Sequence, residues 1–156
     1  MNDRQKPAAR FFDDFKPGDS FTSLGGALSE AEIMEFGHKY DPQPFHIDKE
    51  AAKKSIFGGL IASGFQTIGF SFKQVWDTGV FGDANLGGHG IDEVRWIKPV
   101  FPGERLVVIA TIEELLPWKS RPDCGTAKVR YVARNARGEP VFSMLASQIL
   151  KRRAKG

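Results

Sequence analysis

An aspartate and a histidine lie five residues apart in the segment DPQPFHID, which runs from Asp41 to Asp48. Carboxylate and imidazole side chains are common proton-transfer groups in enzymes. Two prolines stiffen the backbone between them. From spacing alone, Asp41 could be a turn residue and His46 a buried structural histidine. The alternative hypothesis is a general acid and a general base held at a fixed separation.

The residues before this segment predict a short amphipathic helix. Ser29 and Glu32 have the spacing of a capping box, in which each side chain bonds to a free backbone N–H of the first turn. Apolar residues then recur at helical spacing, so we expect a helix over 30–39. Pro42 ends it, because the residue before a proline is pushed out of helical geometry.

The residues after the segment predict a short helical stretch, a loop and a long helix. Asp48 is placed to cap KEAAKK. Residues 57–64, FGGLIASG, contain three glycines and predict a loop. From 65 to 76 one face carries apolar residues at helical spacing, which predicts a buried helix. The residues of this face are Phe65, Ile68, Phe72, Val75 and Trp76.

From Ile91 onward the apolar pattern changes to a period of two, which is typical of β-strands. Strands are predicted over 105–113, 128–134 and 141–150, and a further short strand before 25. Turn signals separate the later strands and favour antiparallel neighbours. A sheet of this kind can bury one apolar helix by curling around it, so the predicted class is α+β. Its open edge strand favours a homodimer.

Composition fits one compact domain in a chain of 156 residues, 41% apolar and 26% charged. No apolar run approaches the roughly 20 residues that cross a bilayer, and the N-terminal residues lack a signal-peptide core. A single cysteine, Cys124, fits a reducing compartment. We therefore expect a cytoplasmic protein without a membrane partner. The net charge of +3 permits a phosphate-bearing ligand but does not favour nucleic acid.

Three segments together carry a family resemblance: YDPQPFHID, FGGLIASG and VRWIKPVFPGERL. In this order they resemble the MaoC-like dehydratases, a group with the hot-dog fold that includes R-specific enoyl-CoA hydratases. The resemblance covers 15–150. It implies an antiparallel sheet wrapped around a long apolar helix, in a dimer or a dimer of dimers. We predict an N-terminal extension over 1–14, one domain over 15–150 and a basic tail over 151–156.

The resemblance also implies site residues and a reaction. Asp41 and His46 correspond to the family's catalytic pair, and the backbone N–H of Gly64 corresponds to its oxyanion donor. The implied reaction interconverts a 2-enoyl-CoA and an (R)-3-hydroxyacyl-CoA, on coenzyme A or a carrier protein, with no cofactor beyond the coenzyme A of the substrate. The substrate-binding residues that we predict are Gln43, Phe57, Ser63 and Arg95.

Several alternatives remain open at this stage. Gly64 could serve only close helix packing, and Ser63 could cap the long helix instead of touching substrate. Gln43 replaces an asparagine found in many hydratases of the family, which shifts the amide by a methylene. The same fold could also hydrolyse thioesters or bind them without turnover.

A metal site is not expected. His38 and His89 have no metal-ligand spacing with His46. Four basic residues could meet the phosphates of coenzyme A. These are Arg95, Lys98, Lys119 and Arg121.

Overall fold

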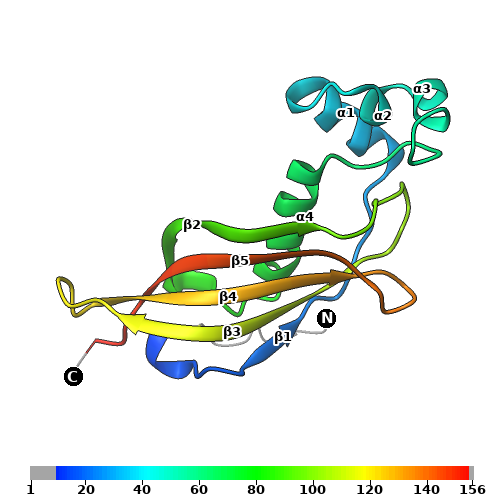
Figure 1. Cartoon of the computed structure of the whole chain (residues 1–156). Helices are drawn as coiled ribbons and strands as arrows, with labels where there is room; N and C mark the ends of the chain where they lie inside the picture. Colours follow the sequence, from blue (N-terminus) through cyan, green and yellow to red (C-terminus); the bar gives the residue numbers. More distant parts are fainter. Residues whose placement is uncertain (1–9, 155–156) are drawn as a thin grey trace, which may run out of the picture.

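The structure is a computed structural model that describes residues 10–154. It shows an antiparallel sheet with a long helix against it and three short helices beyond one end (Figure 1). The helices are α1 (Glu30–Tyr40), α2 (Pro44–Ile47), α3 (Lys49–Lys53) and α4 (Gly64–Trp76), with 3₁₀ turns at Phe12–Asp14 and Gly82–Ala84. The strands are β1 (Ser20–Thr22), β2 (Asn85–Trp96), β3 (Val107–Pro117), β4 (Cys124–Arg134) and β5 (Pro140–Lys151). The predicted α+β class is confirmed.

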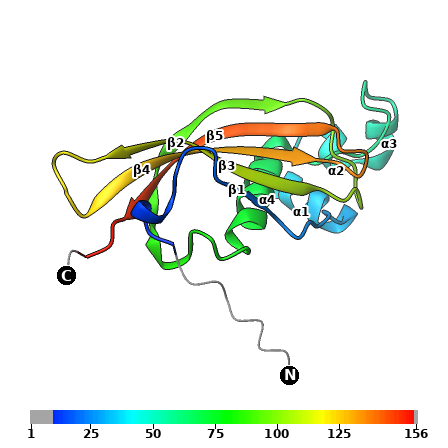
Figure 2. The ribbon, with the colours of Figure 1, turned by 90° about the horizontal axis from the view of Figure 1, so that it is seen from below.

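The sheet has five strands in the order β1-β3-β4-β5-β2, and every neighbouring pair is antiparallel. The tip of the β3–β4 hairpin extends away from α1, α2 and α3 (Figure 2). Strand β2 forms one edge of the sheet, and most of its side chains are exposed in the single chain. This edge has no covering element within residues 10–154.

Alternate residues of the central strands form the core. On β4 the buried side chains include Val129, Tyr131 and Ala133, and their partners on β5 are Ala146, Met144 and Phe142. This period of two matches the pattern that predicted these strands. The buried face of the sheet is the one against which α4 packs.

Helix α4 meets the sheet with a face that matches the predicted one only in part: Val75 is buried and Ile68 packs against the core, as predicted. Its buried residues are Thr67, Ser71 and Val75, at intervals of four. Phe65 and Trp76, expected to be buried, are 61% and 41% exposed. Small side chains let the helix approach β3 and β4 closely, and the bulky aromatic residues then lie to the side. Phe65, Phe72 and Trp76 therefore remain partly exposed in the single chain.

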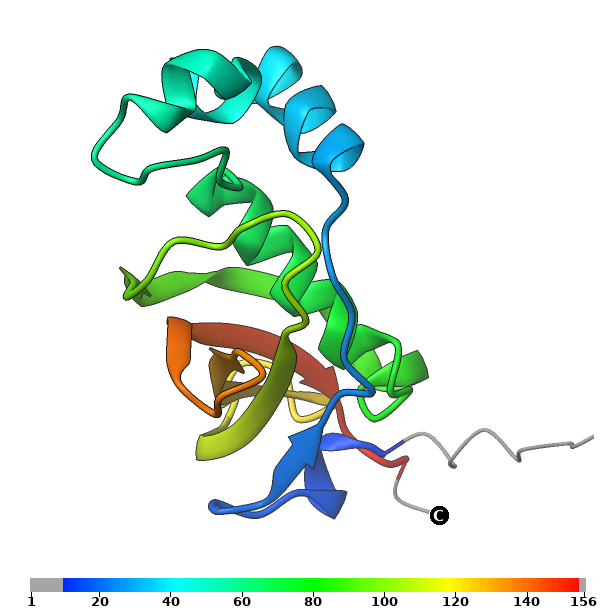
Figure 3. The same cartoon turned by 90° about the vertical axis from the view of Figure 1, so that its right-hand side faces the viewer.

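Helices α1 to α3 lie beyond the sheet at the N-terminal end of α4 (Figure 3). The capping box of α1 is present: Ser29 Oγ accepts from the N–H of Glu32, and the Glu32 carboxylate accepts from the N–H of Ser29. Gln66 on α4 donates to the carbonyl of Glu32 at 3.1 Å, which ties the two helices together. These contacts fix the segment after α1 next to the start of α4.

Both ends of the described chain pack on the domain. Phe12 is buried and lies against Gly125 of β4. Arg152 and Arg153 pair with Asp13 and Asp14, each at 2.6 Å. Neutralised charges and a buried ring thus hold residues 12–14 and 151–153, which belong to the predicted N-terminal extension and basic tail, against the domain. Residues 1–9 and 155–156 lie outside the described part.

Among the helices of residues 10–154, none is long and apolar enough to cross a membrane.

Candidate active site

Two prolines place Asp41 and His46 side by side. Helix α1 ends at Tyr40. The N–H of the next residue, Asp41, still bonds to Gly37 O, and Pro42 prevents a further turn. Pro44 then begins α2, where a missing N–H has no cost. His46 in α2 brings its Nε2 to 3.2 Å from Oδ2 of Asp41. The two side chains are buried, with residue exposures of 8% for Asp41 and 3% for His46.

The other ring nitrogen of His46 fixes the proton position. Nδ1 lies 2.7 Å from the carbonyl oxygen of Ile61. A carbonyl oxygen only accepts hydrogen bonds, so Nδ1 must carry the proton and donate. In the neutral imidazole Nε2 is then the acceptor, and it lies on the side of Asp41. The ring is thus held in one tautomer and one orientation by a main-chain group of the loop before α4.

Two neutral donors hold the carboxylate of Asp41. Ser63 Oγ donates to Oδ2 at 2.7 Å, and Gln43 Nε2 donates to Oδ1 at 2.7 Å. Burial alone would raise the pKa of Asp41, but these two hydrogen bonds and the neighbouring His46 outweigh burial, so the pKa lies below its ordinary value. Asp41 is therefore ionised at neutral pH.

The start of α4 lies beside this pair. Ser63 Oγ also accepts from the N–H of Phe65 at 3.3 Å and so caps the helix. Gly64 is the first residue of α4. The N–H at this position has no hydrogen-bond partner inside the helix and lies at the positive end of the helix dipole. A side chain on Gly64 would collide with the indole ring of Trp96. Close packing and an oxyanion role are thus both compatible with glycine here.

One cavity of about 400 Å³ joins these groups. Asp41, His46 and Gly64 all line it, although they come from three separate parts of the chain. Most of its other lining is apolar. These residues include Phe45, Phe57, Ile61, Phe65, Trp96, Val100 and Val141. Such a cavity suits an apolar group that ends next to a carboxylate, an imidazole and a helix start.

The MaoC like domain family model matches residues 14–134 of the chain. The chain belongs to this family. Its fold is the hot-dog fold, which is shared by solved structures related to it. The resemblance noted from the three sequence segments is thereby confirmed.

The relatives of this MaoC-like protein named below cover 70% to 94% of its chain. The protein YdeM of Bacillus subtilis, whose activity is uncharacterized, is 34% identical over 140 residues, which cover 90% of this chain and 98% of YdeM. The (R)-specific enoyl-CoA hydratase of Rhodospirillum rubrum is 29% identical over 110 residues, covering 70% of this chain and 74% of that enzyme. The crystal structure of a MaoC-like dehydratase from R. rubrum has a TM-score of 0.84 and 35% identity, and covers 94% of this chain and 99% of that one.

The predicted substrate-binding residues of the MaoC-like domain do not all reach the cavity. Gln43 and Phe57 line it, and the Phe57 ring packs on Phe45. Ser63 is fully buried behind the carboxylate and is not part of the lining. Arg95 is exposed on β2, where its Nη1 donates to the carbonyl of Val94 at 2.9 Å.

Of the other basic candidates, Lys98 lines the cavity and pairs with Glu139. Arg121 pairs instead with Asp123 at 2.8 Å.

Sequence reasoning missed Trp96 as a cavity residue. Its ring packs against Gly64 and meets the Phe65 ring edge-on at 5.9 Å between centroids. Only its place in the segment VRWIKPVFPGERL pointed to it. Strand periodicity could not, because an irregularity in β2 changes which face Trp96 occupies.

Within residues 10–154 no group of three or more His, Cys, Asp or Glu side chains is arranged to hold a metal ion.

Proposed function

We propose that this protein is an acyl-thioester hydratase or dehydratase that interconverts a 2-enoyl-CoA and an (R)-3-hydroxyacyl-CoA. The observation that carries the proposal is the single cavity in which an ionised carboxylate, an imidazole of fixed tautomer and the start of a helix meet. The relationship to the R-specific enoyl-CoA hydratase of R. rubrum supports the same reaction class. No cofactor beyond the coenzyme A of the substrate is required.

The pair of acceptors suits one water molecule. Asp41 is ionised and only accepts, and Nε2 of His46 accepts when the ring is neutral, because Nδ1 then carries the only ring proton and donates it to Ile61 O. A water that donates one hydrogen to each group would satisfy both and turn an oxygen lone pair toward the cavity. Such a water is positioned and polarised for attack on a double bond.

In the hydration direction, the water oxygen bonds to C3 of the enoyl thioester while His46 or Asp41 takes a proton from it. The electrons of the C2–C3 double bond move to the thioester oxygen, which becomes an enolate. The N–H of Gly64 at the start of α4 stabilises that charge. Return of a proton to C2 completes the addition, and the reverse sequence eliminates water. Because the two side chains are coupled, the pair acts as one proton-transfer unit.

Crotonyl-CoA and a panel of longer and branched enoyl-CoA thioesters test the proposal through loss of the enoyl absorbance. We expect Asp41→Asn and His46→Ala to lower turnover by about 10² to 10⁴-fold, the usual contribution of a positioned acid or base. His38→Ala, an exposed histidine on α1, is the matched control and should keep the wild-type rate. No hydration across the panel, or unchanged rates in both variants, contradicts the proposal.

A second assay separates hydration from the other activities that the fold could support. Release of free coenzyme A would reveal a thioesterase. Tight binding of acyl-CoA without any turnover would indicate a binding protein.

We also propose that a second copy of the chain covers the exposed β2 edge. Six bulky apolar residues on α4 and β2 remain exposed in the single chain, and monomeric proteins rarely leave such surface open. They are Phe65, Phe72, Trp76, Leu86, Ile91 and Trp96. Light scattering coupled to gel filtration should find a dimer, and Phe72→Glu should shift it to monomer. Ile56→Glu, at a residue 95% exposed beside α3, is the control that should leave the dimer intact.

A further inference from the structure

Strand β2 contains an extra residue at Glu93. Asp92 lies opposite Leu145 and Arg95 lies opposite Ser143, so two residues of β2 face the single position between them on β5. Glu93 has φ of 51°, the only positive φ at a non-glycine residue in the described chain. The two other irregularities of β2 involve Gly87 and Gly90, where positive φ is easily adopted. The third irregularity instead carries the glutamate side chain of Glu93, although positive φ is unfavourable for any residue other than glycine.

This bulge decides which way Trp96 points. Ile91 lies opposite Ala146, and Trp96 lies opposite Phe142, and both partners belong to the buried face of the sheet. Residues 91 and 96 are an odd number of positions apart, so a regular strand would put them on opposite faces. The extra residue at Glu93 puts both on the α4 side.

Trp96 uses that orientation at the candidate active site. Its ring lies against the backbone of Gly64, meets Phe65 and forms part of the cavity wall. A change in the position of this ring would alter both the shape of the apolar cavity and the access to the N–H of Gly64.

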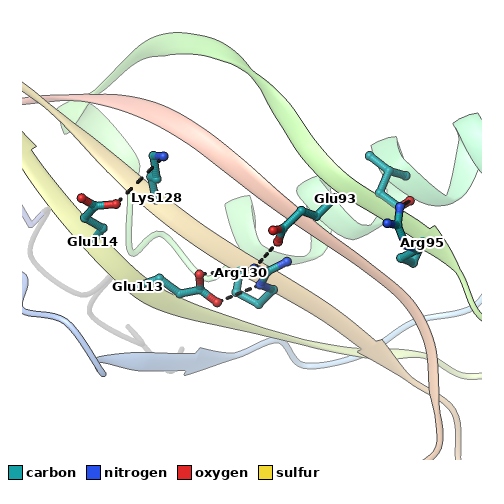
Figure 4. A network of polar contacts seen from close by, with 7 residues as sticks. Glu93, Arg95, Glu113, Glu114, Lys128 and Arg130 are labelled. Carbon is teal, nitrogen blue, oxygen red and sulfur yellow. Dashed lines mark hydrogen bonds and ion pairs between the residues drawn. The ribbon is translucent and has the colours of Figure 1, made fainter.

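Side chains on the outer face hold the bulge (Figure 4). The Glu93 carboxylate is bound by Nη2 of Arg130 at 2.5 Å, although Arg130 is on β4 and β5 lies between the two strands. Nε of Arg130 bonds to Glu113 of β3 at 2.8 Å, which anchors the guanidinium from the other side. Arg95 adds a bond to the carbonyl of Val94 within the bulge.

We propose that Arg130 and Glu93 are positioning residues that hold the β2 bulge, so that Trp96 stays against Gly64 and sets the length of acyl chain that the cavity accepts. The inference rests on the proposed function for its ligand class, acyl thioesters. Neither positioning residue touches the substrate. Their effect reaches the site only through Trp96, from the opposite face of the sheet.

The first experiment follows Trp96 without any substrate. Trp76→Phe combined with Trp118→Phe leaves Trp96 as the only tryptophan among the three in the chain. In this background we expect Arg130→Met and Glu93→Gln to increase quenching of Trp96 by acrylamide, by less than twofold because Trp96 is already 53% exposed in the single chain. Lys128→Met is the matched control: Lys128 is on the same strand and the same face and pairs with Glu114 of β3 at 4.0 Å, but it does not contact the bulge. It should leave the quenching unchanged.

The second experiment measures dissociation constants for saturated acyl-CoA of increasing chain length, and kcat and KM for the matching enoyl-CoA. Trp96→Ala should move the preference toward longer chains, by about fourfold for each methylene that gains apolar contact. Arg130→Met and Glu93→Gln should shift it in the same direction by a smaller factor, with Lys128→Met at the wild-type preference. The shift should lie mainly in KM, because the water-binding pair is untouched.

The outcomes separate this inference from the proposed function. Chain-length-dependent binding that changes in Arg130→Met, without turnover in any variant, supports the inference and rejects the hydratase. Turnover with a chain-length preference that is the same in Trp96→Ala and wild type overturns the inference alone. Equal quenching of Trp96 in Arg130→Met and Lys128→Met also overturns it, and so does an absence of acyl-CoA binding.

Discussion

Two networks in this molecule pair carboxylates with hydrogen-bond donors, and they differ in what they can do. Asp41 is held by the hydroxyl of Ser63 and the amide of Gln43, next to an imidazole, and it opens onto the cavity. On the outer face of the sheet, Arg130 binds Glu93 and Glu113 in contact with solvent. The bond distances are similar in the two networks. The networks differ in how deeply they are buried and in whether their donors are neutral or charged.

Proton chemistry is possible only in the first network. Glu113 raises the pKa of Arg130, against the opposing effect of burial, so this guanidinium never releases a proton. The donors around Asp41 are neutral, and His46 can gain or lose a proton at Nε2. The comparison teaches that a charged network with a permanent cation can position parts of the fold, while a carboxylate held by neutral donors beside histidine can exchange protons with a ligand.

The largest effect is expected from Gly64→Ala, at the boundary of the buried network. The added methyl collides with Trp96, so the ring or the first turn of α4 must move. We expect a fall in turnover of about 10² to 10³-fold, comparable to the loss of an oxyanion donor. Overpacking should also cost about 1 to 3 kcal/mol of unfolding free energy. Turnover and urea unfolding measure the two effects.

A double substitution separates the two roles of Gly64. If glycine is needed only for close packing, Gly64→Ala combined with Trp96→Ala should regain the rate of Trp96→Ala. If the loss persists, the geometry of the N–H at the helix start is what matters. Gly69→Ala is the control on the same helix, where a Cβ meets nothing within 4 Å. It should keep the rate and stabilise the protein by roughly 0.5 to 1 kcal/mol.

Ser63→Ala should have the next largest effect, because Ser63 serves both the helix and the carboxylate. Loss of the cap should lower stability by about 1 kcal/mol. Loss of the bond to Asp41 removes one cause of the lowered pKa, so this pKa should rise and the acid limb of the pH–rate profile should move to higher pH. Ser29→Ala removes the corresponding cap of α1 without touching Asp41. Equal pH profiles in the two variants would contradict the role given to Ser63.

Local sequence signals predicted the elements around the site well. The capping box at Ser29, the stop at Pro42 and the cap at Asp48 all depend on contacts within a few residues, and the structure contains each of them. The strands were predicted because one face of the sheet is buried, which imposes a period of two on residues such as Val129 and Tyr131.

Other features depend on contacts that are distant in sequence. The buried face of α4 is chosen by how closely β3 and β4 approach, which favours Thr67 and Ser71 over larger aromatic residues. Trp96 faces the cavity only because Glu93 adds a residue to β2. The partners of Asp41 and His46 at Ser63 and Ile61 come from a loop that periodicity does not place. These contacts are three-dimensional, so no local pattern encodes them.

Acid unfolding should sharpen the contrast between the two networks. Because the pKa of Asp41 is lower in the folded protein, its ionised form contributes stability that is fully present above its ordinary pKa of about 3.9 and is lost as pH falls through the lowered value. Asp41→Asn lacks this contribution. Urea unfolding should therefore show wild type and Asp41→Asn approaching each other in stability below about pH 4. A constant difference between them across this range would contradict the assigned ionisation.

The smallest effect is expected on the outer face. Arg130 is 25% exposed at its side chain, and Glu93 and Glu113 are 57% and 42% exposed, so solvent screens both pairs. Arg130→Met should lower the unfolding free energy by at most about 1 kcal/mol, and Lys128→Met by less, since exposed ion pairs contribute little. Urea unfolding at low and high salt measures both, and the difference should shrink with salt. A loss of several kcal/mol in Arg130→Met would mean that the bulge supports the whole sheet, and the network could no longer be separated from folding as a device that positions Trp96.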